Sequence, residues 1–217
     1  MKKIHYLAIA AGLVATSGLP FMVHANTQAS VKKMVDEYVI DGERYKKFGP
    51  EVMPILADMY RDAKDLRTKN EIVQIISSIG WESREAKYAL LADVNTQDEE
   101  LRIHLQYALG HISSDDDVVQ TLLDKMQNDP NAYFRDKAAC ALAYDQRHLN
   151  EKQKFKLIEG LIGALDNATP QVRAIAIKAL KIQTGQTKGF SPNAPKNERD
   201  VKVEVWKLWL EEYRKNI

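Results

Sequence analysis

Residues 169–180 read TPQVRAIAIKAL, and the spacing within this stretch returns three more times along the chain. Arg173 follows an apolar residue, and small or apolar residues stand three, six and seven positions after it. The same frame surrounds Arg135 in YFRDKAACALA and Arg102 in ELRIHLQYALG, while EIVQIISSIG has Ile72 at the arginine position. From 72 to 102, 135 and 173 the intervals are 30, 33 and 38 residues, a period typical of solenoids made from helical pairs.

A second amphipathic segment of helical period precedes each copy of the frame. These segments are PEVMPILADMYRDA, SREAKYALLADV, DDDVVQTLLDKMQ and EKQKFKLIEGLIGAL, and polar turns such as NDPNA and DNATP follow several of them. Strand-like alternation is scarce. The sequence therefore predicts an all-α protein, a right-handed α-solenoid of about four helical hairpins in which each hairpin shelters the apolar face of its neighbour.

Two of the copies carry a proline ahead of the arginine. Asp129-Pro130 precedes Phe134-Arg135, and Thr169-Pro170 precedes Val172-Arg173. This pattern resembles the HEAT repeat family, particularly its short bacterial form named after phycobilisome lyases, over roughly residues 50–183. The connector GFSPNAP at 189–195 is similar to the ending of exported bacterial HEAT-repeat proteins, where it leads into a Trp-rich helix. The resemblance implies a scaffold fold that hosts many different roles.

The first residues have the features of a secretory signal peptide. Lys2 and Lys3 precede an apolar run from Tyr6 to about Ala15, and Val23-His24-Ala25 supplies small residues at the cleavage positions. A membrane anchor is the alternative, but polar residues and a proline between positions 16 and 20 interrupt the run before the roughly 20 residues that a spanning helix needs. We therefore expect cleavage after Ala25 and a periplasmic or secreted product with no membrane insertion.

The expected organisation has four parts. They are a signal peptide at 1–25, an N-terminal helix at 26–48, HEAT-like repeats at 49–184, and a Gly/Pro-rich connector with an aromatic capping helix at 185–217. Removing Lys2 and Lys3 leaves 29 basic residues against 30 acidic ones, which disfavours nucleic acid or an anionic membrane as partner. The single cysteine, Cys140, excludes an internal disulfide.

The three frame arginines have a structural interpretation. At 100° per residue, the arginine position lies about 20° from the buried position seven residues later, so it borders the apolar stripe. Its stem can cover apolar surface while its guanidinium reaches the adjoining repeat. The HEAT resemblance implies this role for Arg102, Arg135 and Arg173, with ligand contact as the alternative.

The opposite side of each second helix is the candidate binding surface. Positions one and five after the arginine should line the concave face of a solenoid, and they hold Val73, Ser77, Ile103, Tyr107, Asp136, Cys140, Ala174 and Lys178. One hypothesis is a groove for a peptide or extended chain, with Ile103 and Tyr107 as anchors. The alternative is that the N-terminal helix SVKKMVDEYV folds onto these residues and buries them.

Motifs for chemistry are missing from the sequence. There is no HExxH, no clustered Cys-His spacing, no nucleophile motif and no phosphate-binding glycine loop. His104 and His111 lie seven residues apart on one helix, too far to chelate one ion. The run Asp115 to Asp117 stands at a helix start, where the backbone dipole favours negative charge. We expect no metal, no cofactor and no catalysis.

Together these features predict a non-catalytic protein-protein interaction scaffold of the bacterial cell envelope. Its partner would be an unidentified protein or extended chain, bound on the concave face of the solenoid, and not nucleic acid. The alternative is an accessory or enzyme role similar to that of phycobilisome-lyase-type HEAT proteins, which would require a deep apolar cleft with a titratable group inside it.

Overall fold

A computed structural model describes residues 18–217 of the chain. Residues 1–17, which hold most of the predicted signal peptide, lie outside the described residues, as do the side chains up to position 24. The described part is all-helical, with eleven α-helices, one short 3-10 turn and no strand. The predicted all-α solenoid is confirmed.

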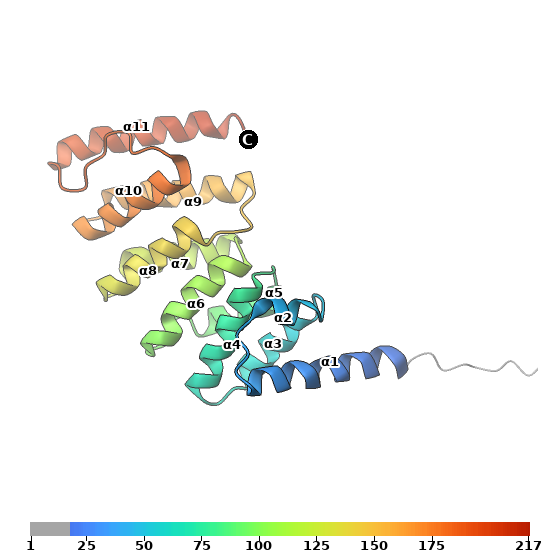
Figure 1. The fold of residues 1–217 in the computed structure, drawn as a ribbon. Helices are drawn as coiled ribbons and strands as arrows, with labels where there is room; N and C mark the ends of the chain where they lie inside the picture. Colours follow the sequence, from blue (N-terminus) through green and yellow to red (C-terminus); the bar gives the residue numbers. More distant parts are fainter. Residues whose placement is uncertain (1–17) are drawn as a thin grey trace, which may run out of the picture.

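The helices form two rows (Figure 1). Contacts join α1 to α3, α3 to α5, α7 to α9 and α9 to α11 in the first row, and they join α2, α4, α6, α8 and α10 in series in the second. The first row comprises α1 (Gly18–Asp36), α3 (Val52–Asp62), α5 (Arg84–Ala92), α7 (Asp116–Asn128), α9 (Glu151–Gly163) and α11 (Lys196–Arg214). The second row comprises α2 (Gly42–Lys46), α4 (Leu66–Ile79), α6 (Glu99–Ile112), α8 (Ala132–Tyr144) and α10 (Pro170–Thr184), and the 3-10 turn η1 (Ala164–Asp166) follows α9.

Local sequence signals set where the second helices begin and end. Asp65 and Asp98 accept hydrogen bonds from backbone N–H groups of the first turns of α4 and α6, and Asn131 does the same for α8. Gly80 ends α4 with a φ of 65°, and Gly185 ends α10 with a φ of 74°. Both glycines occupy the left-handed region, which residues with a Cβ adopt at a cost.

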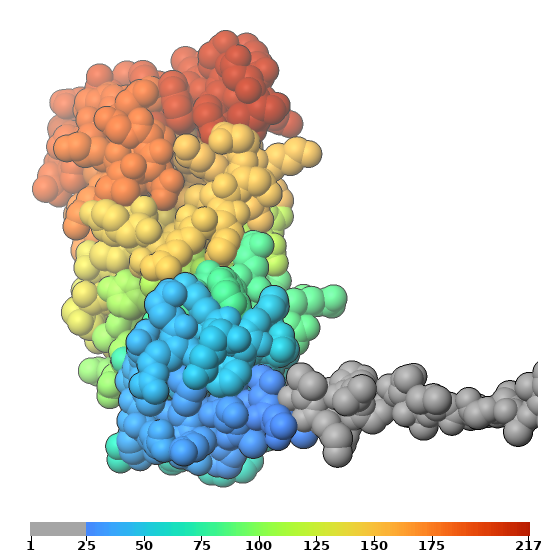
Figure 2. All heavy atoms as spheres, turned by 45° about the vertical axis from the view of Figure 1, so that its right-hand side comes forward, coloured from blue at the N-terminus to red at the C-terminus, as the bar shows by residue number. Residues whose placement is uncertain are grey.

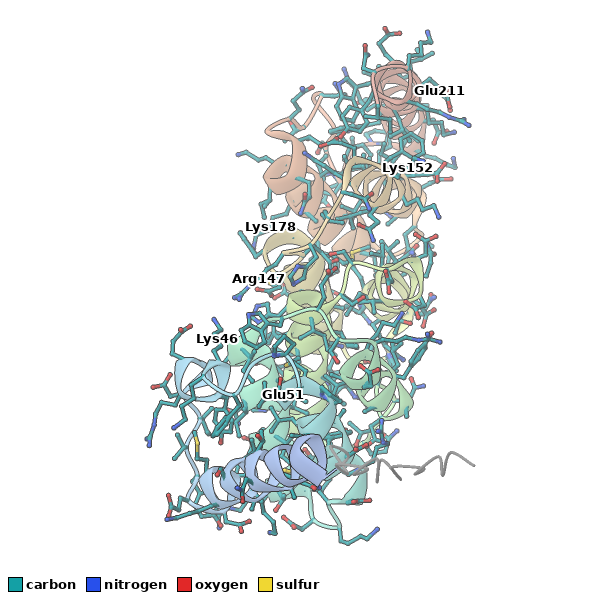
Figure 3. All side chains as sticks on the ribbon, turned by 90° about the vertical axis from the view of Figure 1, so that its right-hand side faces the viewer. Lys46, Glu51, Arg147, Lys152, Lys178 and Glu211 are labelled. Carbon is teal, nitrogen blue, oxygen red and sulfur yellow. The ribbon has the colours of Figure 1, made fainter. Side chains whose placement is uncertain are left out.

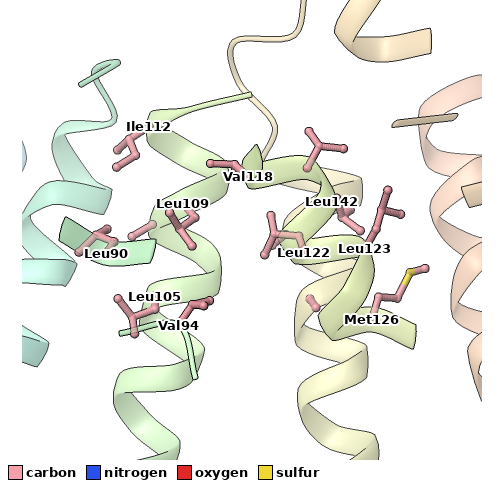
Figure 4. Packing of buried hydrophobic residues seen from close by; sticks show 14 of the residues in the cluster. Leu90, Val94, Leu105, Leu109, Ile112, Val118, Leu122, Leu123, Met126 and Leu142 are labelled. Atoms are coloured by element: carbon pink, nitrogen blue, oxygen red, sulfur yellow. The ribbon is translucent and has the colours of Figure 1, made fainter. Parts of the chain in front are cut away.

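One continuous apolar core lies between the two rows. Figure 4 shows its middle, with Leu105 and Leu109 on α6, Leu122 on α7 and Leu142 on α8. Each of these leucines is fully buried, and burying one such side chain contributes about 1.5–3 kcal/mol. Neither row alone could shelter these side chains, so the stack is held together by burial between neighbouring hairpins.

The N-terminal helices begin the stack as a pair. Gly42 of α2 lies so close to α4 that a Cβ there would stand 2.6 Å from the backbone carbon of Ser78, and Gly42 N donates to Ser78 Oγ over 2.9 Å. Tyr45 is fully buried beside them, and burial raises its pKa to about 12 against the opposing effect of Arg44. Thus α2 covers the end of α4, while α1 packs on α3.

The C-terminal helix α11 closes the other end of the stack (Figure 2). Its buried side chains include Val203, Trp206 and Leu210, and Trp206 meets Trp209 edge to face at 5.5 Å between ring centroids. Val201 and Val205 do not join this packing, since they are 61% and 40% exposed. They lie on the outer side of α11, away from the buried stripe. Among residues 18–217, no helix is long and apolar enough to span a membrane.

Candidate binding surface

The frame arginines tie each repeat to the next. Arg173 is 5% exposed, and its Nη1 donates to the carbonyl oxygens of Asn167 at 2.7 Å and Ala168 at 2.8 Å, in the turn before its own helix. Its Nε donates to the carbonyl oxygen of Pro192, in the connector that follows, over 2.8 Å. The guanidinium therefore cross-links two segments that would otherwise leave buried carbonyls without donors.

The other two arginines repeat this arrangement. Arg135 donates to the carbonyl oxygen of Asp129 over 2.7 Å and to Oε1 of Gln171, in the next repeat, over 2.9 Å from Nε. Arg102 donates to the carbonyl oxygen of Thr96 over 2.9 Å and pairs with the buried carboxylate of Asp129 at 3.2 Å. All three side chains lodge between successive hairpins and are not placed to bind a ligand.

In the first repeat, the structure corrects the register of the sequence frame. Arg102, Arg135 and Arg173 each stand three residues after the start of their helix, and the matching residue of α4 is Lys69. Lys69 Nζ lies 2.5 Å from Asp93 Oδ2, so it makes the cross-link that an arginine makes elsewhere. Ile72, which the sequence frame placed there, is fully buried one turn later. The missing arginine is therefore a lysine, and the frame was displaced by three residues.

This displacement removes Val73 from the candidate surface. Val73 is fully buried in the core, and Asn70 and Gln74 are the residues of α4 that match Ile103 and Tyr107 of α6. The other predicted residues remain on the second row with some exposure, since Ser77, Ile103, Tyr107, Asp136 and Cys140 are half-buried and Lys178 is exposed. The predicted alternative, covering by the segment 30–39, does not account for Ile103 and Tyr107, which stay partly exposed.

The open side of α6, α8 and α10 is called the second-helix surface below. Figure 3 places Arg147 and Lys178 on this side of the molecule and Lys152 and Glu211 on the opposite side. Its described side chains are half-buried or exposed, and they include aromatic, aliphatic and charged groups. They are Ile103, Tyr107, Tyr133, Asp136, Lys137, Cys140, Tyr144, Lys178, Lys181 and Ile182.

A groove lies between α8 and α10 within this surface, and it unites three of the predicted residues. Asp136 and Cys140 stand on its α8 wall, and Lys178 stands on its α10 wall. The remaining lining is apolar, consisting of Ala139, Ala143, Tyr144, Ile175, Ala179 and Ile182. The alanines let the two helices pack closely, so the groove is a shallow crease with a volume of about 10 Å³ and does not enclose a side chain.

The surroundings of the cysteine in this groove lower its reactivity below that of a free thiol. Burial raises the pKa of the Cys140 thiol, and the carboxylate of Asp136 adds to the rise, while Lys178 and Lys137 act in the opposite direction. A thiol with a raised pKa carries little thiolate at neutral pH, and the thiolate is the nucleophile. Cys140 therefore contributes a small lining group to the groove.

A row of polar side chains joins three repeats at one edge of the second row. Ser77 Oγ lies 2.7 Å from His111 Nδ1, and His111 Nε2 lies 2.9 Å from Asp145 Oδ1. A second pair, Asn70 Oδ1 and His104 Nδ1, is 3.0 Å apart. Sequence reasoning considered the two histidines only as metal ligands and missed these pairs, although each joins residues 34 positions apart.

The order serine, histidine, aspartate invites comparison with a nucleophilic triad. The carbonyl oxygen of Ser77 also lies 3.1 Å from His111 Nδ1. Nε2 lies against Nη2 of Arg147 at 3.2 Å as well as against the Asp145 carboxylate, so both ring nitrogens of His111 are held by side chains or backbone of neighbouring segments. The row is therefore a structural cross-link. Within residues 18–217, no group of three His, Cys, Asp or Glu side chains could hold a metal ion.

Comparisons with known proteins place the chain by its fold. No protein-family model matches the sequence, and no curated protein matches it either. Among solved structures, a designed armadillo repeat protein in complex with the peptide (KR)4 is similar, with a TM-score of 0.50 and 21% sequence identity. The match covers 92% of this chain and 96% of that one. The chain is thus a helical-repeat solenoid, and its HEAT resemblance stays a prediction from the sequence.

Proposed function

We propose that this protein is a non-catalytic scaffold that binds an extended polypeptide segment along the second-helix surface. The observation that carries the proposal is the groove between α8 and α10, whose apolar lining ends at two exposed side chains. Tyr144 is 61% exposed and Ile182 is 36% exposed. Exposed aromatic groups beside a groove are typical anchors for a bound chain.

The architecture supports the proposal in a second way. The similar designed armadillo repeat protein is described in complex with the peptide (KR)4, so a solenoid of similar fold binds a peptide. In the present chain α2 covers the end of α4, which leaves α6, α8 and α10 as the open helices. We place the binding segment on these three.

Selection of peptides tests this function directly. Random dodecapeptides displayed on phage are selected against the native protein, and the best are measured by fluorescence anisotropy. We expect binding to weaken about tenfold when Tyr144→Ser and Ile182→Ser are combined, since anchor residues carry most of the binding energy. Tyr88→Ser provides a matched control, because Tyr88 is 50% exposed on α5 of the other row. Selected peptides that bind both variants equally would place binding elsewhere.

We also propose that the chain acts in the cell envelope after removal of a signal peptide. The described buried side chains of α1, namely Val31, Met34 and Val35, all follow the predicted cut after Ala25. Cleavage would therefore leave the packing of α1 on α3 in place. Determining the first residue of the protein purified from its native compartment tests this, and we expect Asn26. A first residue at Met1 would contradict it.

A further inference from the structure

The charges of the second-helix surface are unevenly paired. Lys178 and Lys181 of α10 are exposed, and neither forms an ion pair with any described residue. Some other exposed lysines have an acidic partner one turn away, as Lys196 has in Asp200 and Lys207 has in Glu204, whereas Lys152 of α9 has none among the described residues. The cations of α10 are therefore available to a partner of opposite charge.

The neighbouring helix adds to this positive field. Lys137 of α8 lies over the ring of Tyr133, 4.7 Å from its centroid, and Arg147 follows α8 in the loop on the same side. The acidic groups nearby are Asp136 and Asp145, and Asp145 is already bonded to His111. Arg147 is likewise bonded to His111, at 3.2 Å, so Lys178 and Lys181 are the cations of this surface that lack a partner among the described residues.

The groove between α8 and α10 adds a requirement of shape. Its lining is shallow and apolar, and Tyr144 and Ile182 are the exposed side chains beside it, so a bound chain would pack on these two side chains. Lys178 stands at the rim of this groove. An apolar residue packed on Tyr144 and Ile182 would bring its neighbours in the bound chain toward the ammonium group of Lys178.

From these observations we propose that the occupant is an extended acidic segment of another protein, whose carboxylate side chains pair with Lys178 and Lys181 and flank an apolar residue that packs on Tyr144 and Ile182 beside the groove between α8 and α10. This inference rests on the proposed function and names its class of partner. A basic segment such as the (KR)4 peptide of the designed armadillo repeat protein would meet Lys178 and Lys181 with like charge. The proposed partner of this chain and the (KR)4 peptide of the designed protein are therefore opposite in charge.

Two fluorescein-labelled octapeptides, EELEELEE and KKLKKLKK, test the inference with the full-length protein. We expect the acidic peptide to bind and the basic one to bind at least tenfold more weakly, and raising the salt from about 50 to 500 mM should weaken the acidic complex. The double variant K178E/K181E should bind the acidic peptide at least tenfold more weakly. The double variant K152E/K154E on α9 has the same net charge and should stay within about twofold of the wild type.

Alkylation of Cys140 locates the bound peptide. Cys140 lines the groove and is the only cysteine in the chain, so the rate of its reaction with a maleimide reports occupancy there. Saturating EELEELEE should slow this rate severalfold in the wild type and leave it unchanged in K178E/K181E. Circular dichroism of both double variants checks that the fold is intact.

The outcomes separate this inference from the proposed function. Equal or tighter binding of KKLKKLKK, unchanged affinity in K178E/K181E, no binding of EELEELEE, or no protection of Cys140 would each overturn the acidic partner. If peptides selected by display still depended on Tyr144 and Ile182, the surface would bind extended chains of another charge. If the selected peptides did not depend on these two residues, the proposed function would fail.

Discussion

His148 Nε2 lies 3.0 Å from the carbonyl oxygen of Gly80, a residue 68 positions earlier in the chain. The same nitrogen lies 2.9 Å from the carbonyl oxygen of His111. Because both oxygens only accept, Nε2 donates to the ends of α4 and α6 together. One side chain in the loop after α8 therefore joins three successive repeats at one edge.

Replacing this histidine should loosen that edge. We expect His148→Ala to lower the free energy of unfolding by about 1 kcal/mol, since two carbonyl oxygens lose their shared donor. Urea denaturation followed by circular dichroism measures the change. Lys152→Ala, at an exposed position of α9, should leave the midpoint in place. An unaltered midpoint for His148→Ala would show that the bridge contributes nothing to stability.

The arginine cross-links should depend on guanidinium geometry as well as on charge. Arg173→Lys keeps the charge but cannot donate to Asn167, Ala168 and Pro192 at once, so we expect a loss of about 1–3 kcal/mol in the free energy of unfolding. Thermal and urea denaturation would measure it. Full stability of the lysine variant would refute the bridging role.

The pair of Lys69 and Asp93 should make stability depend on pH. Burial acts to raise the pKa of Asp93, but hydrogen bonds from Lys69 and Tyr60 outweigh it and hold the pKa below its usual value. A carboxyl group with a lowered folded pKa stabilises the folded state above its unfolded pKa of about 3.9, and this contribution disappears as the pH falls through the folded value.

The substitution Asp93→Asn tests that dependence. We expect it to lower the free energy of unfolding at pH 7 and to flatten the decline of stability below about pH 4, as measured by urea titrations across the acid range. Asp62→Asn serves as control, because Asp62 is exposed at the end of α3. A decline in acid as steep as that of the wild type would assign the effect to other carboxylates.

A buried amide offers a stabilising change. Gln106 of α6 is fully buried, and within residues 18–217 neither its Nε2 nor its Oε1 has a hydrogen-bond partner. Unsatisfied polar atoms in a core cost about 1–3 kcal/mol, so Gln106→Leu should raise the free energy of unfolding by about 1 kcal/mol. Urea denaturation measures this as well. A destabilised variant would indicate that the amide is satisfied by a bound water.

The repeats were predictable from sequence where arginine marked them. Arg135 and Arg173 combine an uncommon residue with a repeated Ala-Leu pair, so their register is unambiguous. The first repeat has Lys69 instead, and its run of isoleucines keeps the same apolar pattern when it is shifted by three residues. Since a helix brings the same face round every three to four residues, hydrophobicity alone could not distinguish Lys69 from Ile72.

The polar pairs between repeats were beyond sequence reasoning for a different reason. Ser77, His111 and Asp145 lie at successive steps along their helices, each displaced slightly from the equivalent position of the one before. That displacement depends on how far each hairpin rotates on its neighbour, which side-chain packing decides. Three residues of the groove lining could be predicted from the sequence. Asp136, Cys140 and Lys178 come from the repeats whose register the sequence defined correctly.

The covering of α4 by α2 sets a length scale for any bound chain. Neighbouring packed helices lie about 8–10 Å apart, and an extended chain advances about 3.3 Å per residue. Each open helix therefore corresponds to about three residues of an occupant, and the three together measure out a segment of roughly six to nine. Successive helices would then contact every third residue of the bound chain. Recognised sequences should therefore repeat their key side chains at intervals of three residues.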